Sequence, residues 1–136
     1  MIFSYSLNEI DKASSFIFKN IKSKTVLFMG DLGSGKTTLI KNICLQLGFN
    51  KNVTSPTFPI LNVYNLKEYN IYHADLYRLD GLKDLNEIGF FDILSQSSWV
   101  FVEWPKKIID HIDQPYSIIK IKVIENQKRL IKIKNR

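Results

Sequence analysis

The sequence predicts an α/β fold with a mixed β-sheet, and three patterns support this prediction. The first is a glycine-rich segment at residues 30–37, which lies between an apolar run and a stretch with helical spacing of apolar residues. The second is the short apolar run at residues 99–102, which is typical of a buried strand. The third is the alternation of apolar residues with lysine in 119–123 and 131–134, which predicts a C-terminal hairpin. We expect one domain over residues 1–136.

The N-terminal segment predicts a short strand at residues 2–5 and then a helix. Ser6 and Glu9 have the spacing of a capping box, in which Ser6 is the N-cap and Glu9 occupies the third helical position. The apolar face of this helix consists of Ile10, Ala13, Ile17 and Ile21.

The glycine-rich segment, Gly30-Asp31-Leu32-Gly33-Ser34-Gly35-Lys36-Thr37, matches the pattern G-x-x-x-x-G-K-[ST] of a phosphate-binding P-loop. Glycines let the backbone curl around an anion, and the N-terminus of the next helix adds to the attraction. We expect Lys36 to reach the β- and γ-phosphates and Thr37 to bind Mg²⁺. The complete set of expected phosphate-binding residues is Asp31, Leu32, Gly33, Ser34, Gly35, Lys36, Thr37 and Thr38.

The flanks of this segment favour a P-loop over a glycine-rich turn that merely caps a helix. Before it lies the apolar run 26–29, which suits a buried strand. After it, apolar residues recur at three- and four-residue steps, and Gly48 stands where a helix C-cap would be. The apolar face of this helix is Leu39, Ile40, Ile43, Cys44 and Leu47. We therefore expect a P-loop NTPase-like three-layer sandwich, a mixed sheet with a C-terminal β-hairpin.

The middle of the chain predicts a hairpin and two short helices. Residues 53–59 contain two prolines and are expected to be extended. The runs 60–64 and 70–74 are rich in strand-forming residues and predict a hairpin. Short helical stretches are expected at 82–88 and 90–95.

Two carboxylates follow predicted strands and are candidates for nucleotide chemistry. Asp75 follows the run 71–74, and Glu103 follows the run 99–102. In open α/β sheets, ligands gather beyond the carboxyl ends of the strands, so both side chains are expected there. The alternative is a surface carboxylate at the start of a loop, which fits Glu103 less well than Asp75.

Three other residues have two interpretations each. Thr57 could belong to a nucleotide-sensing switch, although the residues alone favour a loop hydroxyl. His73 could be a catalytic base, but its alternating neighbours favour a half-buried strand residue. Trp104 could belong to the core or could stack at the edge of the site, and the sequence does not decide between these.

The composition limits the remaining possibilities. The net charge of +6 could reflect RNA contact, but lysines spread along the whole chain favour a solvated surface. The single cysteine, Cys44, is expected to be a buried thiol in a cytoplasmic protein. We find neither a signal peptide nor a stretch of the ~20 apolar residues that a membrane span needs.

Two P-loop classes fit the sequence poorly. A GTPase needs Asn-Lys-x-Asp to read its base, and Asn50-Lys51-Asn52-Val53 has valine where aspartate is required. A small-molecule kinase usually has a mobile basic lid, yet the only arginines are Arg78, Arg129 and Arg136.

Five motifs together resemble the TsaE family, also called YjeE, over residues 6 to 107. The P-loop, extended here to Thr38, is the least specific of them. The others are Ser55-Pro56-Thr57-Phe58, His73-Ala74-Asp75-Leu76-Tyr77-Arg78-Leu79, Glu87-Ile88-Gly89 and Glu103-Trp104-Pro105. The C-terminal hairpin agrees with the family in pattern only.

The resemblance implies an ATPase that assists threonylcarbamoylation of adenosine 37 in tRNA with two partner proteins, TsaB and TsaD. It implies ATP and Mg²⁺ as cofactors. Contact with tRNA is possible and is expected to be indirect, and no membrane partner is expected. Lys36 would hold phosphate, and Thr37 and Glu103 would hold Mg²⁺ or orient water through it. Asp75 would complete the hydrolytic site.

The family resemblance also gives Thr57 a place in a switch and Trp104 a place beside the site. Pro59 departs from the family, which more often has threonine there, and this residue would stiffen the switch segment. Two other functions remain open from the residues. One is a binding module controlled by ATP occupancy, and the other is a small-molecule kinase.

Overall fold

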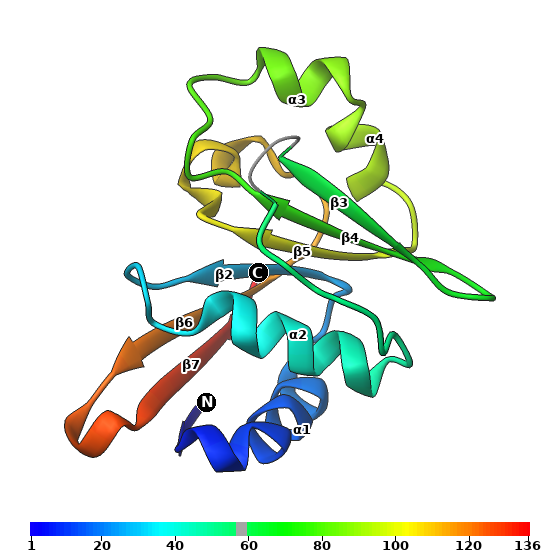
Figure 1. Cartoon of the computed structure of the whole chain (residues 1–136). Helices are drawn as coiled ribbons and strands as arrows, with labels where there is room; N and C mark the ends of the chain where they lie inside the picture. Colours follow the sequence, from blue (N-terminus) through cyan, green and yellow to red (C-terminus); the bar gives the residue numbers. More distant parts are fainter. Residues whose placement is uncertain (57–59) are drawn as a thin grey trace.

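The computed structural model describes residues 1–56 and 60–136, which form a seven-stranded mixed sheet with helices on both faces (Figure 1). The strand order is β1-β7-β6-β2-β5-β4-β3. The four central strands, β6, β2, β5 and β4, run parallel, and the outer strands pair antiparallel. The strands are β1 Ile2–Tyr5, β2 Thr25–Met29, β3 Leu61–Asn65, β4 Asn70–Asp75, β5 Trp99–Glu103, β6 Ser117–Val123 and β7 Arg129–Asn135.

The helices divide between the two faces of the sheet, with α1 and α2 at the bottom of Figure 1 and α3 and α4 at the top. They are α1 Ile10–Asn20, α2 Lys36–Gln46, α3 Lys83–Glu87 and α4 Phe90–Leu94, with short 3₁₀ turns at Leu7–Glu9, Pro105–Lys107, Ile109–His111 and Glu125–Gln127. On β2, Val26 and Phe28 pack toward α1 and α2, while Leu27 packs toward α3 and α4. This alternation makes two apolar cores and confirms the three-layer α/β sandwich.

Local signals in the sequence are confirmed at the start of the first helix and at the end of the second. The Ser6 backbone N–H donates to Glu9 Oε1 at 3.1 Å, so the capping box forms, although the first turn is a 3₁₀ turn. Gly48 ends α2 with a φ of +104°, a conformation that glycine adopts without the strain a Cβ would bring. Cys44 lies on the apolar face of α2 and is buried, as predicted.

Both predicted hairpins are present. β3 pairs antiparallel with β4, and β6 with β7. In the C-terminal hairpin Ile119, Ile121, Ile131 and Ile133 are buried, while Lys120, Lys122, Lys132 and Lys134 are exposed. The prediction of one solvated face is therefore correct.

The parallel centre of the sheet brings three strand ends together. Because β2, β5 and β4 run parallel and are adjacent, the P-loop after β2 and the last residues of β5 and β4 share one edge. The Leu76 N–H also donates to the Glu103 carbonyl oxygen at 3.1 Å, which ties the two strand ends. Within residues 1–56 and 60–136, none of the helices has the length and apolar character needed to cross a membrane.

Candidate nucleotide-binding site

The predicted P-loop connects β2 to the N-terminus of α2. Gly33 and Gly35 have φ angles of +76° and +104°, so the loop uses backbone conformations that favour glycine. Gly30 is required for a different reason. A Cβ there would lie 2.5 Å from Ser34 Oγ and 2.7 Å from the Ile121 carbonyl oxygen. The loop is therefore held tightly between its own residues and β6.

Lys36 is folded against the loop and is only 5% exposed. Its Nζ donates to the carbonyl oxygens of Gly30, at 2.7 Å, and Asp31, at 3.0 Å. The ammonium lies 4.2 Å from the centre of the Trp104 ring, within the range of a cation–π interaction. Burial lowers the pKa of Lys36, and the nearby Glu103 carboxylate opposes this change.

Glu103 is the last residue of β5 and is 2% exposed. The Thr37 hydroxyl donates to its Oε1 at 2.9 Å and lies 3.1 Å from its Oε2. The structure thus brings together the two residues that the sequence predicts as Mg²⁺ ligands. It also excludes the alternative of a surface carboxylate for Glu103.

His73 lies in β4, as predicted, but its side chain is more deeply buried than the sequence suggests. It is 0% exposed rather than half-buried, and its Nε2 lies 2.7 Å from Glu103 Oε2. The alternating neighbours correctly predict a strand, but they do not reveal that helix α2 covers this face. His73 therefore contacts the site through Glu103, which sequence reasoning missed.

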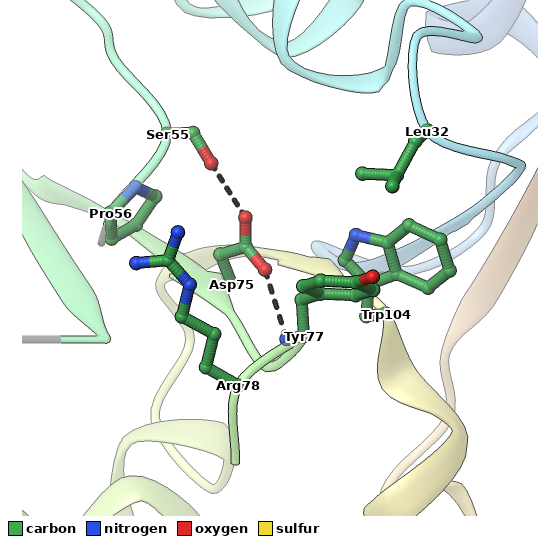
Figure 2. Close-up of a pocket in the computed structure, with 7 residues that line it drawn as sticks. All are labelled: Leu32, Ser55, Pro56, Asp75, Tyr77, Arg78 and Trp104. Atoms are coloured by element: carbon green, nitrogen blue, oxygen red, sulfur yellow. Dashed lines mark hydrogen bonds between the residues drawn. The ribbon is translucent and has the colours of Figure 1, made fainter. Parts of the chain in front are cut away.

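Asp75 ends β4 directly opposite Glu103 in the parallel register. Its Oδ2 accepts a hydrogen bond from Ser55 Oγ at 2.6 Å, and its Oδ1 accepts one from the Tyr77 N–H at 3.0 Å (Figure 2). Asp75 thus links the segment around Ser55, which precedes β3, to the end of β4. Thr57 and Pro59 lie in residues 57–59, outside the described part of the chain.

Trp104 follows Glu103 and lies at the edge of the site. Its backbone is left-handed, with φ 56° and ψ 57°, which costs a non-glycine residue about 1–2 kcal/mol. The ring is half-buried and lies 4.8 Å from the Tyr77 ring, between centroids. Figure 2 shows both rings beside Leu32, and Arg78 on the other side of Asp75. The strained turn directs the indole over Lys36.

Two adjoining pockets occupy this edge of the sheet. One, of about 350 Å³, is lined by P-loop and strand-end residues together with Leu7 and Arg129. The other, of about 360 Å³, is drawn in Figure 2 and shares Leu32, Ser55, Asp75 and Trp104 with the first. Of the predicted phosphate-binding set, Leu32, Gly33, Gly35, Lys36, Thr37 and Thr38 line the first pocket, whereas Asp31 and Ser34 do not.

Arg129 was missed by sequence reasoning, which named it only as one of the three arginines. Its Nε donates to the Ser34 carbonyl oxygen at 3.2 Å, across 95 residues of sequence. β7 begins at Arg129 and lies next to β6, so the hairpin carries this cation to the P-loop. Nothing local to residues 125–136 signals that contact.

The residues present fit a nucleotide phosphate. Among the buried side-chain polar atoms that the structure describes, Ser34 Oγ alone has no hydrogen-bond partner, and it belongs to the P-loop. Within the same described ranges, no group of three or more His, Cys, Asp or Glu side chains could hold a metal ion by itself. This suits Mg²⁺, which usually binds one or two protein ligands together with substrate phosphates and water.

Comparisons with known proteins show which family the chain resembles over most of its length. The family described as "Threonylcarbamoyl adenosine biosynthesis protein TsaE" matches residues 4–131. The tRNA threonylcarbamoyladenosine biosynthesis protein TsaE of Rickettsia typhi is 37% identical, over 96% of this chain and 93% of that protein. The TsaE of Treponema pallidum is 30% identical over 82% of each chain. The crystal structure of Bacillus subtilis YdiB matches with a TM-score of 0.71 and 27% identity, covering 98% of this chain and 83% of that chain. The chain therefore belongs to the TsaE family of threonylcarbamoyl adenosine biosynthesis proteins.

Proposed function

We propose that this chain binds and hydrolyses ATP with Mg²⁺ at the P-loop, and that this activity sustains threonylcarbamoylation of adenosine 37 in tRNA. The observation that supports it best is the contact of Thr37 with the buried carboxylate of Glu103. A hydroxyl at the start of the P-loop helix and a carboxylate at the end of a neighbouring strand are the protein ligands of Mg²⁺ in P-loop NTPases.

Each residue of the site has a role that follows from its place. The Lys36 ammonium has three N–H donors, of which two contact the carbonyl oxygens of Gly30 and Asp31, and it donates hydrogen bonds to phosphate oxygens with the third or by releasing these carbonyls. Arg129 and the N-terminus of α2 add positive charge around the same pocket. Asp75, opposite Glu103, supplies a second carboxylate where water would be oriented. When bound, Mg²⁺ would neutralise charge that develops on the phosphates.

The role in tRNA modification rests on the family. The related proteins are named for tRNA threonylcarbamoyladenosine biosynthesis. We infer that this chain acts in the cytoplasm with TsaB and TsaD, that TsaD carries the transfer step, and that ATP hydrolysis resets the complex between turnovers. The tRNA is then contacted indirectly, through the partner proteins.

Reconstituted threonylcarbamoyl transfer to tRNA over many turnovers tests the proposal. TsaB and TsaD from the same source are supplied with no added chain, with the intact chain, or with Lys36→Ala or Glu103→Gln. We expect only the intact chain to sustain turnover, with ATP consumed in parallel. A Glu103→Gln variant that binds ATP and sustains full turnover would instead support a binding module controlled by occupancy. Transfer of phosphate to a small molecule rather than to water would support a kinase.

A further inference from the structure

His73 is a buried histidine whose two ring nitrogens both have partners. Nε2 lies 2.7 Å from Glu103 Oε2, and Nδ1 lies 2.9 Å from the Tyr64 hydroxyl oxygen. Tyr64 comes from β3, the neighbour of β4, and is 6% exposed. Its hydroxyl also lies 3.2 Å from the Thr54 carbonyl oxygen. A line of polar contacts therefore leads from the Thr54 carbonyl oxygen to the carboxylate at the P-loop, and its two contacts at His73 are buried.

The arrangement of acceptors determines which nitrogen of His73 carries a proton toward the site. A carboxylate can only accept, so Nε2 must donate to Glu103. If the Tyr64 hydroxyl donates to Nδ1, the imidazole is neutral. If the hydroxyl donates to Thr54 instead, both ring nitrogens carry protons. In either case the hydrogen on Nε2 faces Glu103.

Glu103 is thus held between two donors on different elements. Thr37 approaches from helix α2, and His73 approaches from strand β4. The register explains this position: His73 and Asp75 are two residues apart on one face of β4, and Asp75 pairs with Glu103. With Glu103 only 2% exposed, water has little access to replace either donor.

We propose that His73 is a positioning residue for Glu103. Its Nε2–H holds Oε2, so that Oε1 stays turned toward Thr37, where the proposed function needs a carboxylate. This inference rests on the proposed function, because it assigns His73 a role in ATP hydrolysis through Glu103. Hydrogen-bonding partners that orient a metal-binding group typically change metal affinity or activity by about 10–100-fold when removed.

Three variants separate this role from simple packing. His73→Leu removes the donor while keeping an apolar side chain in the core. His73→Gln retains an N–H that can reach Glu103. Ile71→Ala is the matched control, because Ile71 is also fully buried on the same face of β4 and pairs with Trp99 rather than with Glu103. We expect Ile71→Ala to lower the melting temperature and leave kcat unchanged.

The kinetic measurement is ATP hydrolysis by these variants, with kcat and KM determined separately and Lys36→Ala run alongside. We expect His73→Leu to lower kcat by about tenfold or more with little change in KM, and His73→Gln to recover most of that loss. Wild-type kcat in His73→Leu, or an equal loss of kcat in Ile71→Ala, would overturn the positioning role. Hydrolysis that Lys36→Ala leaves intact would instead overturn the proposed function.

A second measurement does not depend on ATP hydrolysis, and its first readout uses the wild-type chain. Long-range ¹H–¹⁵N NMR of the unliganded wild-type chain reports which imidazole nitrogens carry protons, and the exposed His111 gives a reference signal. We expect a proton on Nε2 of His73, and a shift of that signal in Glu103→Gln. A His73 ring protonated at Nδ1 alone would contradict the inference, whether or not the chain hydrolyses ATP.

Calorimetric titration of Mg²⁺ into the ADP-bound chain completes the test. We expect weaker Mg²⁺ binding for His73→Leu and unaltered binding for Ile71→Ala.

Discussion

The Thr37 hydroxyl and the Glu103 carboxylate are in direct contact, at 2.9 Å and 3.1 Å to the two carboxylate oxygens, although 66 residues separate them in the sequence. The contact joins the first turn of α2 to the end of β5. It exists because β5 lies beside β2 in parallel, so its carboxyl end meets the P-loop. The proposed chemistry depends on this contact between a hydroxyl and a carboxylate.

Replacement of Lys36 by alanine is expected to weaken ATP binding by roughly ten- to a hundredfold. The reason is the loss of a charge-assisted hydrogen bond to phosphate, which is worth about 1.5–3 kcal/mol. Isothermal titration calorimetry measures the change. Lys41→Ala is the control, because Lys41 is exposed on the same helix. Equal affinity in the two variants would contradict the assignment of Lys36.

Replacement of Glu103 by glutamine is expected to separate binding from hydrolysis. The amide keeps the shape of the side chain and can still contact Thr37, so ATP affinity should change little. The hydrolysis rate should fall by about a hundredfold or more, which is typical when a group that activates or orients the attacking water is lost. Glu68→Gln, an exposed change in the loop between β3 and β4, is the control. A hydrolysis rate equal to that of the control would exclude a role for Glu103 in hydrolysis.

Most of this site could be predicted from the sequence because its parts are local. A P-loop is contiguous, and a carboxylate at the end of an apolar run is visible without the fold. His73 and Arg129 could not be assigned in this way. The burial of His73 depends on helix α2 covering its face of the sheet. The position of Arg129 depends on β6 lying next to β2 and β7 next to β6. Such pairings between distant segments leave no local pattern.

The hydrogen bond between Ser55 and Asp75 is expected to stabilise the fold by about 1 kcal/mol. A double-mutant cycle with Ser55→Ala, Asp75→Ala and the double variant isolates this energy from the other effects of each change, because alanine leaves no acceptor at residue 75. Urea unfolding measures the free energy of each variant. The 2.6 Å contact predicts that the two changes are not additive. Strictly additive losses would show that the contact contributes nothing to stability.

Two glycines of the P-loop are expected to respond differently to alanine. Gly30→Ala places a Cβ within 2.7 Å of a backbone oxygen of β6, so the neighbouring chain must shift. Such overpacking usually costs about 1–3 kcal/mol. Gly33→Ala meets no atom within 4 Å and has only the strain of a φ of +76°, about 1–2 kcal/mol. Denaturant unfolding should therefore rank Gly30→Ala as equally or more destabilising, and the reverse order would contradict the tight contact at Gly30.

Alkaline pH is expected to destabilise the fold through buried groups whose pKa is raised by burial, among them Cys44 and Tyr5. Burial raises the pKa of Cys44 from 9.0 to about 12, and raises the pKa of Tyr5 from 10.0 to about 12, where Arg129 opposes the change. The folded state therefore holds these protons more tightly than the unfolded chain. Their contribution to the free energy of unfolding is complete below pH 9 and is lost progressively as the pH rises toward 12.

The variant Cys44→Val isolates the thiol from the other groups that titrate in this range. It keeps an apolar side chain in the core and removes the thiol, so the fall in unfolding free energy between pH 8 and pH 10.5 should be smaller than in the wild type. Denaturant unfolding at a series of pH values gives both slopes. Because Tyr5 still titrates in the variant, some fall should remain above pH 10. Identical slopes in the two proteins would show that Cys44 does not contribute to the pH dependence of stability.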